Sequence, residues 1–145
     1  MIAVKFVVLP GGKLPERKTE GAACADCYAR IDPVIIMQTI HPGETGIVPL
    51  GFKLAVPDGY YAEIRPRSGL SSKGIIEIMG TIDSDYRGEV GAIIFNGSKE
   101  NFRICNGDRI CQMMIKKEIK YKIAVVDKLD KTERGNGGFG STGVK

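Results

Sequence analysis

The stretch GIIEIMGTIDSDYRGEVGAIIFN, residues 74–96, consists of two apolar segments on either side of a polar cluster. The segments 74–82 and 89–96 are short and rich in isoleucine, which is typical of β-strands. Between them, DSDYR at 83–87 is the densest polar cluster of the chain and contains turn-forming residues. The stretch therefore predicts two strands joined either by a plain hairpin tip or by a site for chemistry.

Similar apolar segments extend in both directions along the chain, and each predicts a strand. They lie at 3–9, 34–40, 51–56, 60–66, 109–115 and 119–126. Turn sequences such as His41-Pro42-Gly43 separate them. Many short strands without a long helical period predict an all-β fold, a distorted jelly-roll or β-barrel-like domain. At most one short helix is expected, from Ser68 to about Lys73, with Ser68 as its N-cap.

The composition narrows the class of protein. A chain of 145 residues, 43% hydrophobic and 26% charged, is long enough for one core and too apolar for wholesale disorder. Its basic residues are scattered and its net charge is only +4, which favours a small anionic ligand and indicates no nucleic-acid partner. With no apolar run of ~20 residues and no basic leader, we expect neither a membrane span nor a secretory signal.

Four cysteines, Cys24, Cys27, Cys105 and Cys111, are expected to be reduced thiols of a cytoplasmic protein. Cys24 and Cys27 form a C-x-x-C pair, but the other two are spaced differently. A metal or redox role is therefore the weaker alternative.

The composition changes after Asp130. Residues 131–145 are rich in glycine and offer little to a core, so we expect a domain over 1–130 and a flexible arm over 131–145. The sequence GNGGFG at 135–140 formally matches a dinucleotide-binding motif, but neither a helix pattern nor a Walker lysine follows it. The arm has the backbone N–H groups, guanidinium and aromatic ring needed to fold over a nucleotide.

Candidate catalytic groups are few. The single histidine, His41, precedes Pro42 and Gly43 and is expected in a surface turn, which makes histidine-based catalysis a poor fit. Carboxylates are the remaining candidates for a general base, and Asp83 lies in the polar cluster described above. From these residues alone, a catalytic aspartate and a plain turn both remain open.

Five segments together resemble, in order, the five motifs of the trimeric dUTPase family. They are GAACADCYA (21–29), PRSGLSSKG (66–74), GTIDSDYRGEVG (80–91), NGDRICQ (106–112) and RGNGGFGSTG (134–143). The first motif departs from the family pattern, because Cys24 and Cys27 replace a usual glycine and a leucine-like residue. Asp26 and Tyr28 still match it.

The resemblance implies an enzyme that hydrolyses dUTP to dUMP and pyrophosphate, and so supplies dUMP for thymidylate synthesis. Asp83 would hold and polarise the water that attacks the α-phosphorus. An aspartate is a weak base, so orientation of the water and neutralisation of phosphate charge should carry most of the acceleration. The cofactor would be Mg²⁺, held by the triphosphate and water with no direct protein ligand.

The resemblance also implies roles in substrate binding. Gly80 and Gly91 would pair with uracil through their backbone groups, and Tyr86 would pack under the deoxyribose. The phosphates would meet Arg67, Ser68, Gly69 and Gln112. Asp26, Asp85, Asp108 and Arg109 are expected to support the site, the last two as an ion pair.

The terminal arm resembles the family lid, in which Arg134 reaches the γ-phosphate and Phe139 stacks on uracil. Gly140, Ser141 and Thr142 belong to the same segment, and the two hydroxyl residues are expected to bind phosphate. The family further implies a homotrimer whose subunits share each active site.

Two alternatives to a dUTP hydrolase remain: an enzyme with a different reaction, and a protein without catalytic activity. A dCTP deaminase shares the fold, but deaminases carry a glutamate where this chain has Ile93, and they lack the glycine-rich terminal motif. A non-catalytic nucleotide-binding protein on the same scaffold is the second alternative, although Asp83, Tyr86, Arg134 and Phe139 are all present.

Overall fold

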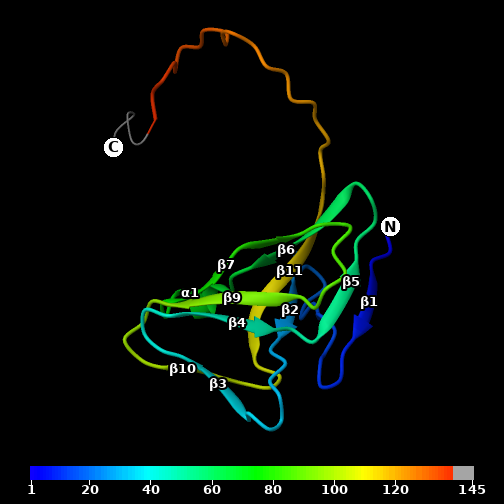
Figure 1. Cartoon of the computed structure of the whole chain (residues 1–145), viewed down its shortest axis with the longest axis vertical. Coiled ribbons are helices and arrows are strands. Elements are labelled where there is room, and N and C mark those ends of the chain that lie inside the picture. The colour runs from blue at the N-terminus through cyan, green and yellow to red at the C-terminus, as the bar shows by residue number, and fades with distance from the viewer. Residues whose placement is uncertain (139–145) are drawn as a thin grey trace.

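The computed structural model describes residues 1–138, which form short strands and one helical turn (Figure 1). The strands are β1 (Lys5–Val8), β2 (Ala25–Tyr28), β3 (Met37–Ile40), β4 (Thr45–Pro49), β5 (Phe52–Ala55), β6 (Tyr60–Arg65), β7 (Ile75–Ile78), β8 (Gly80–Ile82), β9 (Gly91–Asn96), β10 (Phe102–Cys105) and β11 (Arg109–Lys117). The helix α1 (Ser68–Ser71) lies between β6 and β7. The predicted all-β class is confirmed.

The strands pair into four separate antiparallel sheets. The larger two have the orders β2-β11-β6-β8 and β4-β9-β7, and the smaller two pair β1 with β5 and β10 with β3. Neighbours far apart in sequence, such as β2 and β11, are a mark of jelly-roll connectivity. Because the sheets do not join, the described residues form no closed barrel.

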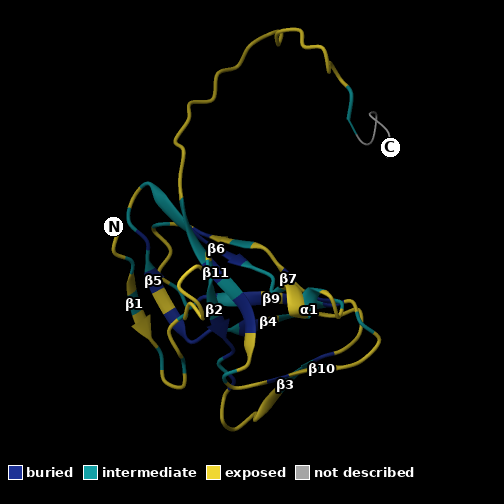
Figure 2. Cartoon of the chain, turned by 180° about the vertical axis from the view of Figure 1, so that it is seen from behind, coloured by how far each residue is buried: buried dark blue, intermediate teal, exposed yellow. Residues whose placement is uncertain are grey.

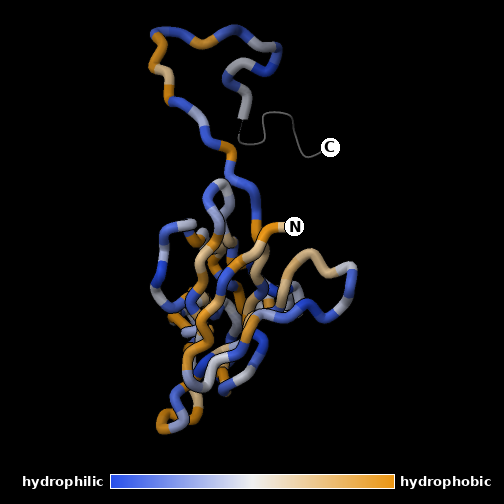
Figure 3. The backbone as a smooth tube through the Cα atoms, turned by 90° about the vertical axis from the view of Figure 1, so that its right-hand side faces the viewer, coloured by the Kyte–Doolittle hydropathy of each residue, from blue (hydrophilic) through white to orange (hydrophobic). Residues whose placement is uncertain are grey.

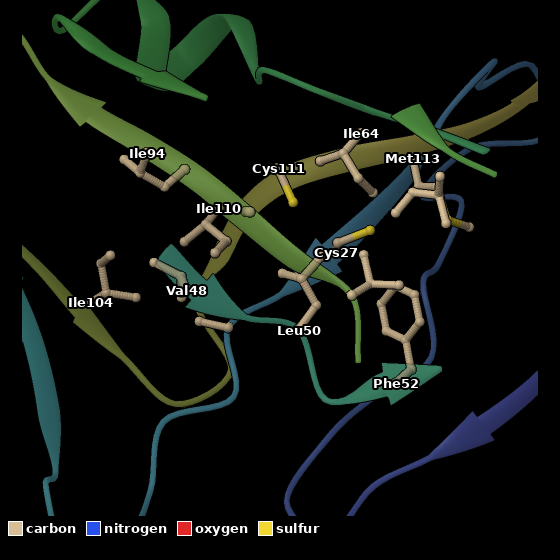
Figure 4. Close-up of a cluster of buried hydrophobic side chains, with 14 of the residues drawn as sticks. Cys27, Val48, Leu50, Phe52, Ile64, Ile94, Ile104, Ile110, Cys111 and Met113 are labelled. Carbon is tan, nitrogen blue, oxygen red and sulfur yellow. The ribbon is translucent and has the colours of Figure 1, made fainter. Parts of the chain in front are cut away.

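One hydrophobic core lies between the two larger sheets and extends under the smaller ones (Figures 2 and 4). Phe52, Leu50, Ile64 and Ile94 are among its largest fully buried side chains. Inward and outward positions alternate on β7 and β9, as expected for strands with one face on a core.

Cys27 and Cys111 are register partners on β2 and β11, and both are fully buried in this core (Figure 4). All four cysteines of the chain are free thiols. The hydrogen bond with Cys27 and, after it, burial raise the pKa of the Cys111 thiol. The pair therefore packs as small apolar side chains rather than as reactive thiolates.

Seven of the eight predicted strand segments overlap observed strands, but their ends differ and residues 1–138 contain eleven strands. Residues 74–82 form two strands because the chain changes partner at Met79, with β7 pairing β9 and β8 pairing β6. The connection 83–90 thus joins two sheets and is not the tip of a two-stranded hairpin. Strands β2, β4 and β10 were not predicted, since their polar and glycine residues obscure the pattern.

The prediction of a strand at 119–126 is wrong for the isolated chain. After β11 ends at Lys117, residues 118–138 contain no strand and run outside the sheets (Figures 1 and 2). Hydrophobic residues stand out along this segment in Figure 3. A β-strand requires a neighbouring edge to satisfy its backbone groups, and here no described strand lies alongside.

The expected helix is present but starts differently. Arg67, in an extended conformation, is the N-cap residue and makes no side-chain cap, so Ser68 is the first helical residue and not the cap. His41 lies in an exposed turn as predicted, where the Glu44 N–H donates to its carbonyl at 3.0 Å.

Candidate active site

A pocket of about 220 Å³ opens between β8 and β9, where the two larger sheets meet. Its wall contains four of the predicted substrate residues, Gly80, Asp83, Tyr86 and Gly91. The remaining lining is apolar apart from Thr81, and includes Ile64, Ile82, Val90 and Ile93. The pocket has the size and apolar walls to hold a planar ring and a sugar, with backbone groups at its edges.

The two glycines leave the backbone at the pocket edge uncovered. At Gly80 an added Cβ would meet nothing within 4 Å, so the absence of a side chain exposes backbone rather than relieving a clash. At Gly91 an added Cβ would lie 3.1 Å from Ile47 Cγ2, which is tighter than ordinary contact. Close approach of a ligand to peptide groups is a common reason for glycine at such places.

Tyr86 forms one wall of the pocket and is 44% exposed. Its hydroxyl donates to the Glu89 carbonyl at 3.0 Å, which folds the ring back over Gly88. A Cβ on Gly88 would lie 2.2 Å from Tyr86 Oη and 2.5 Å from Cζ. The ring can occupy this place only because residue 88 has no side chain.

Asp83 is exposed at the end of β8. Its carbonyl accepts from the Tyr86 N–H at 3.2 Å, which forms the turn that follows the strand. A second, wider cavity of about 530 Å³ begins at the same aspartate and includes Thr81, Ser84 and Asp85. Asp83 therefore lines both the ring-sized pocket and a wider space large enough for further ligand groups and water.

A second cluster contains the predicted phosphate-binding residues. Arg67 contacts Asp26 Oδ1 through Nε at 3.3 Å and donates from Nη1 to the Arg109 carbonyl at 2.7 Å. Arg109 Nη1 lies 3.0 Å from Asp26 Oδ2. Gln112 Nε2 donates to the Pro66 carbonyl at 2.8 Å and so holds the segment that leads into Arg67.

Ser68 and Gly69 are exposed in the single turn of α1 that follows Arg67. The predicted ion pair of Asp108 with Arg109 is not formed. Asp108 Oδ2 accepts from the Cys105 N–H at 2.8 Å, because residues 105–108 form a tight turn, while Arg109 turns to Asp26.

The pocket cluster and the arginine cluster are distinct within one chain. No hydrogen bond or ion pair among the side chains of residues 1–138 joins Asp83, Tyr86, Gly80 or Gly91 to the residues around Arg67. Arg134 donates to the Gly137 carbonyl at 2.9 Å, in the terminal segment that runs away from the sheets (Figure 1). Phe139, Gly140, Ser141 and Thr142 lie outside the described residues.

A third feature, an ion pair between Arg30 and Glu89, was not predicted from the sequence. Arg30 donates to both carboxylate oxygens of Glu89, at 2.8 Å from Nε and 2.7 Å from Nη2. The two residues are far apart in sequence, and only knowledge of the fold brings them together.

Residues 1–138 were also compared with the requirements of a metal site and of a membrane-spanning helix. Within residues 1–138, no group of three or more His, Cys, Asp or Glu side chains is placed to hold a metal ion. Over the same range, none of the helical structure has the length and apolar character required to cross a bilayer.

The fold and the two clusters define an all-β domain that offers a ring-sized pocket with a carboxylate at its mouth and a separate guanidinium site. Comparison with known proteins identifies the family. A family model described as dUTPase matches residues 11–143, so the chain belongs to the dUTPase family.

Relatives named deoxyuridine 5'-triphosphate nucleotidohydrolase match over nearly their whole length. The protein from Desulfotalea psychrophila is 44% identical, and the alignment covers 97% of each chain. The protein from Finegoldia magna is 43% identical, with 97% of this chain and 98% of the relative covered.

Solved structures agree on the fold. A point mutant of the dUTPase of Staphylococcus bacteriophage 80alpha, with dUpNHpp, superposes with a TM-score of 0.88 at 24% identity, covering 99% of this chain and 100% of that one. A mutant dUTPase from phage phi11 of S. aureus, in which a structural Mg(II) ion is coordinated, has a TM-score of 0.79 at 20% identity, covering 90% and 100%.

Proposed function

We propose that this protein hydrolyses dUTP to dUMP and pyrophosphate, thereby lowering dUTP and supplying dUMP for thymidylate synthesis. Membership of the dUTPase family and the names of relatives about 44% identical over nearly full length support the reaction. The observation that carries it in this chain is the pocket, whose wall combines Asp83 and Tyr86 with two glycines.

The nucleoside binds in the pocket between β8 and β9. Backbone groups at Gly80 and Gly91 pair with uracil, and their polarity rejects cytosine. Rejection of thymine by fit alone is limited, because one methyl group changes specificity by only ~10–200-fold. Tyr86 packs against the deoxyribose and leaves no room for a ribose 2′-hydroxyl.

The phosphates bind at the arginine cluster. The Arg67 guanidinium has the planar geometry that phosphate oxygens prefer, and Ser68, Gly69 and Gln112 lie beside it in the chain or in space. The triphosphate itself holds Mg²⁺, since this ion usually keeps several waters and binds through substrate phosphates. When bound to the triphosphate, Mg²⁺ would supply neutralisation of phosphate charge without a carboxylate cage from the chain.

Asp83 positions the attacking water. The carboxylate accepts a hydrogen bond from this water and orients its oxygen toward the α-phosphorus, in line with the bridging oxygen that departs. As the new bond joins the water oxygen to the α-phosphorus, the water gives up a proton to solvent by way of the Asp83 carboxylate, and the bond to the bridging oxygen breaks, so that pyrophosphate leaves. Orientation and charge neutralisation provide most of the rate acceleration.

A homotrimer with shared active sites completes the arrangement. Two features support it: no side-chain hydrogen bond or ion pair among residues 1–138 joins the pocket to the arginine cluster, and residues 119–129 present many exposed apolar side chains. In the complete site the arm of residues 131–145 closes over the nucleotide. Arg134 reaches the γ-phosphate, Phe139 stacks on uracil, and Gly140, Ser141 and Thr142 line the phosphates.

The cytoplasm is the proposed location. Support comes from the cysteines, of which Cys27 and Cys111 pack in the core as free thiols.

A screen of the canonical nucleoside triphosphates for pyrophosphate release with Mg²⁺ tests the proposal. We expect release from dUTP far above every other nucleotide. Conversion of dCTP to a deoxyuridine nucleotide would identify a deaminase instead, and binding of dUTP without turnover would identify a non-catalytic binder.

A further inference from the structure

The carboxylate of Glu89, the residue before the pocket-lining Val90, accepts three hydrogen bonds. Oε1 accepts from Arg30 Nε at 2.8 Å and from the Gly51 N–H at 3.0 Å, while Oε2 accepts from Arg30 Nη2 at 2.7 Å. Both side chains are largely shielded, with 29% of Arg30 and 25% of Glu89 exposed. A two-point guanidinium–carboxylate contact fixes direction as well as distance.

The electrostatics agree with this geometry. The hydrogen bonds from Arg30 and, to a smaller extent, from the Gly51 N–H hold the pKa of Glu89 below its ordinary value. Arg30, Gly51 and Glu89 are called the Glu89 clamp below.

Gly51 is required for the clamp to form. Its φ is +73°, and an added Cβ would lie 2.4 Å from Gly12 Cα and 2.9 Å from Arg30 Cδ. The backbone on either side is fixed too, because Leu50 N–H donates to Val90 O at 2.9 Å and Val90 N–H donates to Phe52 O at 3.0 Å. The clamp therefore anchors the peptide of Glu89 to the β4–β5 connection.

The anchored peptide is the one that holds Tyr86. The Glu89 carbonyl accepts from Tyr86 Oη at 3.0 Å, and the ring lies where a side chain on Gly88 would be. A shift of the Glu89 peptide would move the tyrosine ring relative to the pocket. Arg30 is not among the pocket-lining residues, and its guanidinium reaches the pocket wall through Glu89.

We propose that the Glu89 clamp and Gly88 are positioning residues that set the Tyr86 ring at the distance which excludes a ribose 2′-hydroxyl, and thus determine discrimination between dUTP and UTP. The inference rests on the proposed function, in which this pocket binds the nucleoside. Arg30, Gly88 and Glu89 need not touch the substrate.

The test measures kcat/KM for dUTP and for UTP with the full-length chain in its native assembly. We expect Arg30→Lys, which keeps the charge but loses the two-point contact, to lower the dUTP/UTP ratio about tenfold. Glu89→Gln and Gly88→Ala are expected to lower it by at least as much. General damage to the fold would reduce both activities in proportion and leave the ratio unchanged. Should Glu89→Gln fail to fold, the other two variants carry the test.

Two further variants make the outcome decisive. Arg103→Lys, on the exposed face of β10, is the matched control and should leave the ratio as in the parent. Tyr86→Ala should lower the ratio the most. An unchanged ratio in Tyr86→Ala would overturn the assignment of the pocket and the inference with it. A lower ratio in Tyr86→Ala but not in Arg30→Lys or Gly88→Ala would overturn the clamp alone.

Discussion

Asp26 and Arg67 form an ion pair in which Arg67 Nε lies 3.3 Å from Asp26 Oδ1. The same carboxylate also holds Arg109, and the Arg109 carbonyl in turn accepts from Arg67. Asp26 is well shielded, with 15% of its side chain exposed. The aspartate thus keeps two guanidinium groups close together that would otherwise repel each other, and it orients the one proposed to bind phosphate.

Asp26→Asn should therefore weaken substrate binding. Without the negative charge, Arg67 and Arg109 repel and Arg67 loses its orientation, so we expect KM for dUTP to rise about tenfold with a smaller change in kcat. Steady-state kinetics measures both constants. Glu20→Gln, an exposed charge change elsewhere, is the control. An unchanged KM in Asp26→Asn would show that Arg67 is oriented by other contacts.

Asp83→Asn should separate binding from turnover. The amide keeps the size of the side chain but lowers its ability to orient and accept a proton from water, a contribution commonly worth about 10²–10⁴-fold. We expect kcat to fall by that factor, while the Kd of a non-hydrolysable imido analogue of dUTP changes less than about threefold. Calorimetry gives the Kd, and undiminished turnover would contradict the proposed role.

The sequence predicts the all-β class well, because isoleucine-rich segments such as 89–96 carry a clear strand pattern. The sequence does not predict which strands pair with one another. Residues 74–82 look like one strand, yet the chain changes sheets at Met79, and only long-range pairing decides that. The error at 119–126 has the same origin, since a strand pattern says nothing of whether an edge is available.

The sequence motifs predict which residues belong to the candidate site. They do not predict which of these residues contact one another in space. Gly80, Asp83, Tyr86 and Gly91 are close in sequence and share one pocket. The link between Arg30 and Glu89 spans strands that are distant in sequence, so no local pattern indicates it. Asp108 and Arg109 are adjacent and look like an ion pair, but Asp108 belongs to the turn before β11, where its carboxylate accepts from the Cys105 N–H, and Arg109 pairs with Asp26 instead.

Burial of Glu77 is expected to make the stability of the fold depend on pH. Only 3% of this β7 residue is exposed, Oε2 has no hydrogen-bond partner among residues 1–138, and burial raises its pKa to about 7. The pKa of this carboxyl is higher in the folded protein than its value of 4.5 in the unfolded chain. The contribution of Glu77 to the stability of the fold is therefore complete below pH 4.5 and is lost as the pH rises through 7. The loss amounts to roughly 3 kcal/mol.

Glu77→Gln should remove this dependence. We expect the free energy of unfolding of the parent to fall between pH 5 and pH 8, and that of Glu77→Gln to stay nearly level, so that the variant is the more stable protein at pH 8. Urea unfolding at fixed protein concentration measures both. Glu100→Gln, exposed after β9, should retain the slope of the parent. A steep slope in Glu77→Gln would assign the effect to another group.

Removal of residues 134–145 should leave the fold and assembly intact and still reduce turnover. The described part of this arm, up to Gly138, belongs to no sheet, and its loss exposes no core residue. We expect kcat/KM for dUTP to fall at least about a hundredfold, with an unchanged thermal unfolding midpoint. Deletion of residues 144–145 alone keeps every proposed arm contact and is the control. Full activity after removal of 134–145 would exclude the lid.

Residues 119–125 carry their apolar side chains at every second position. Ile119, Tyr121, Ile123 and Val125 are 82–95% exposed in the single chain, while lysines occupy positions 120 and 122. This alternation is that of a strand with one buried face. The backbone and the apolar face both lack a partner among residues 1–138, and pairing with another subunit would provide one for each.

Ile123→Asp should therefore weaken the proposed trimer. Burial of an isoleucine contributes about 1.5–3 kcal/mol, and a trimer would bury three copies, so a charge at this position is expected to shift the assembly toward smaller species at micromolar concentration. Analytical ultracentrifugation measures the shift. Lys122→Asp places the same charge on the opposite face and should leave the mass of the assembly unchanged.

Because the active sites are proposed to be shared, dUTP hydrolysis should fall in Ile123→Asp as the assembly dissociates and recover at higher protein concentration. A monomeric parent with full activity would contradict both the shared site and the pairing of this segment.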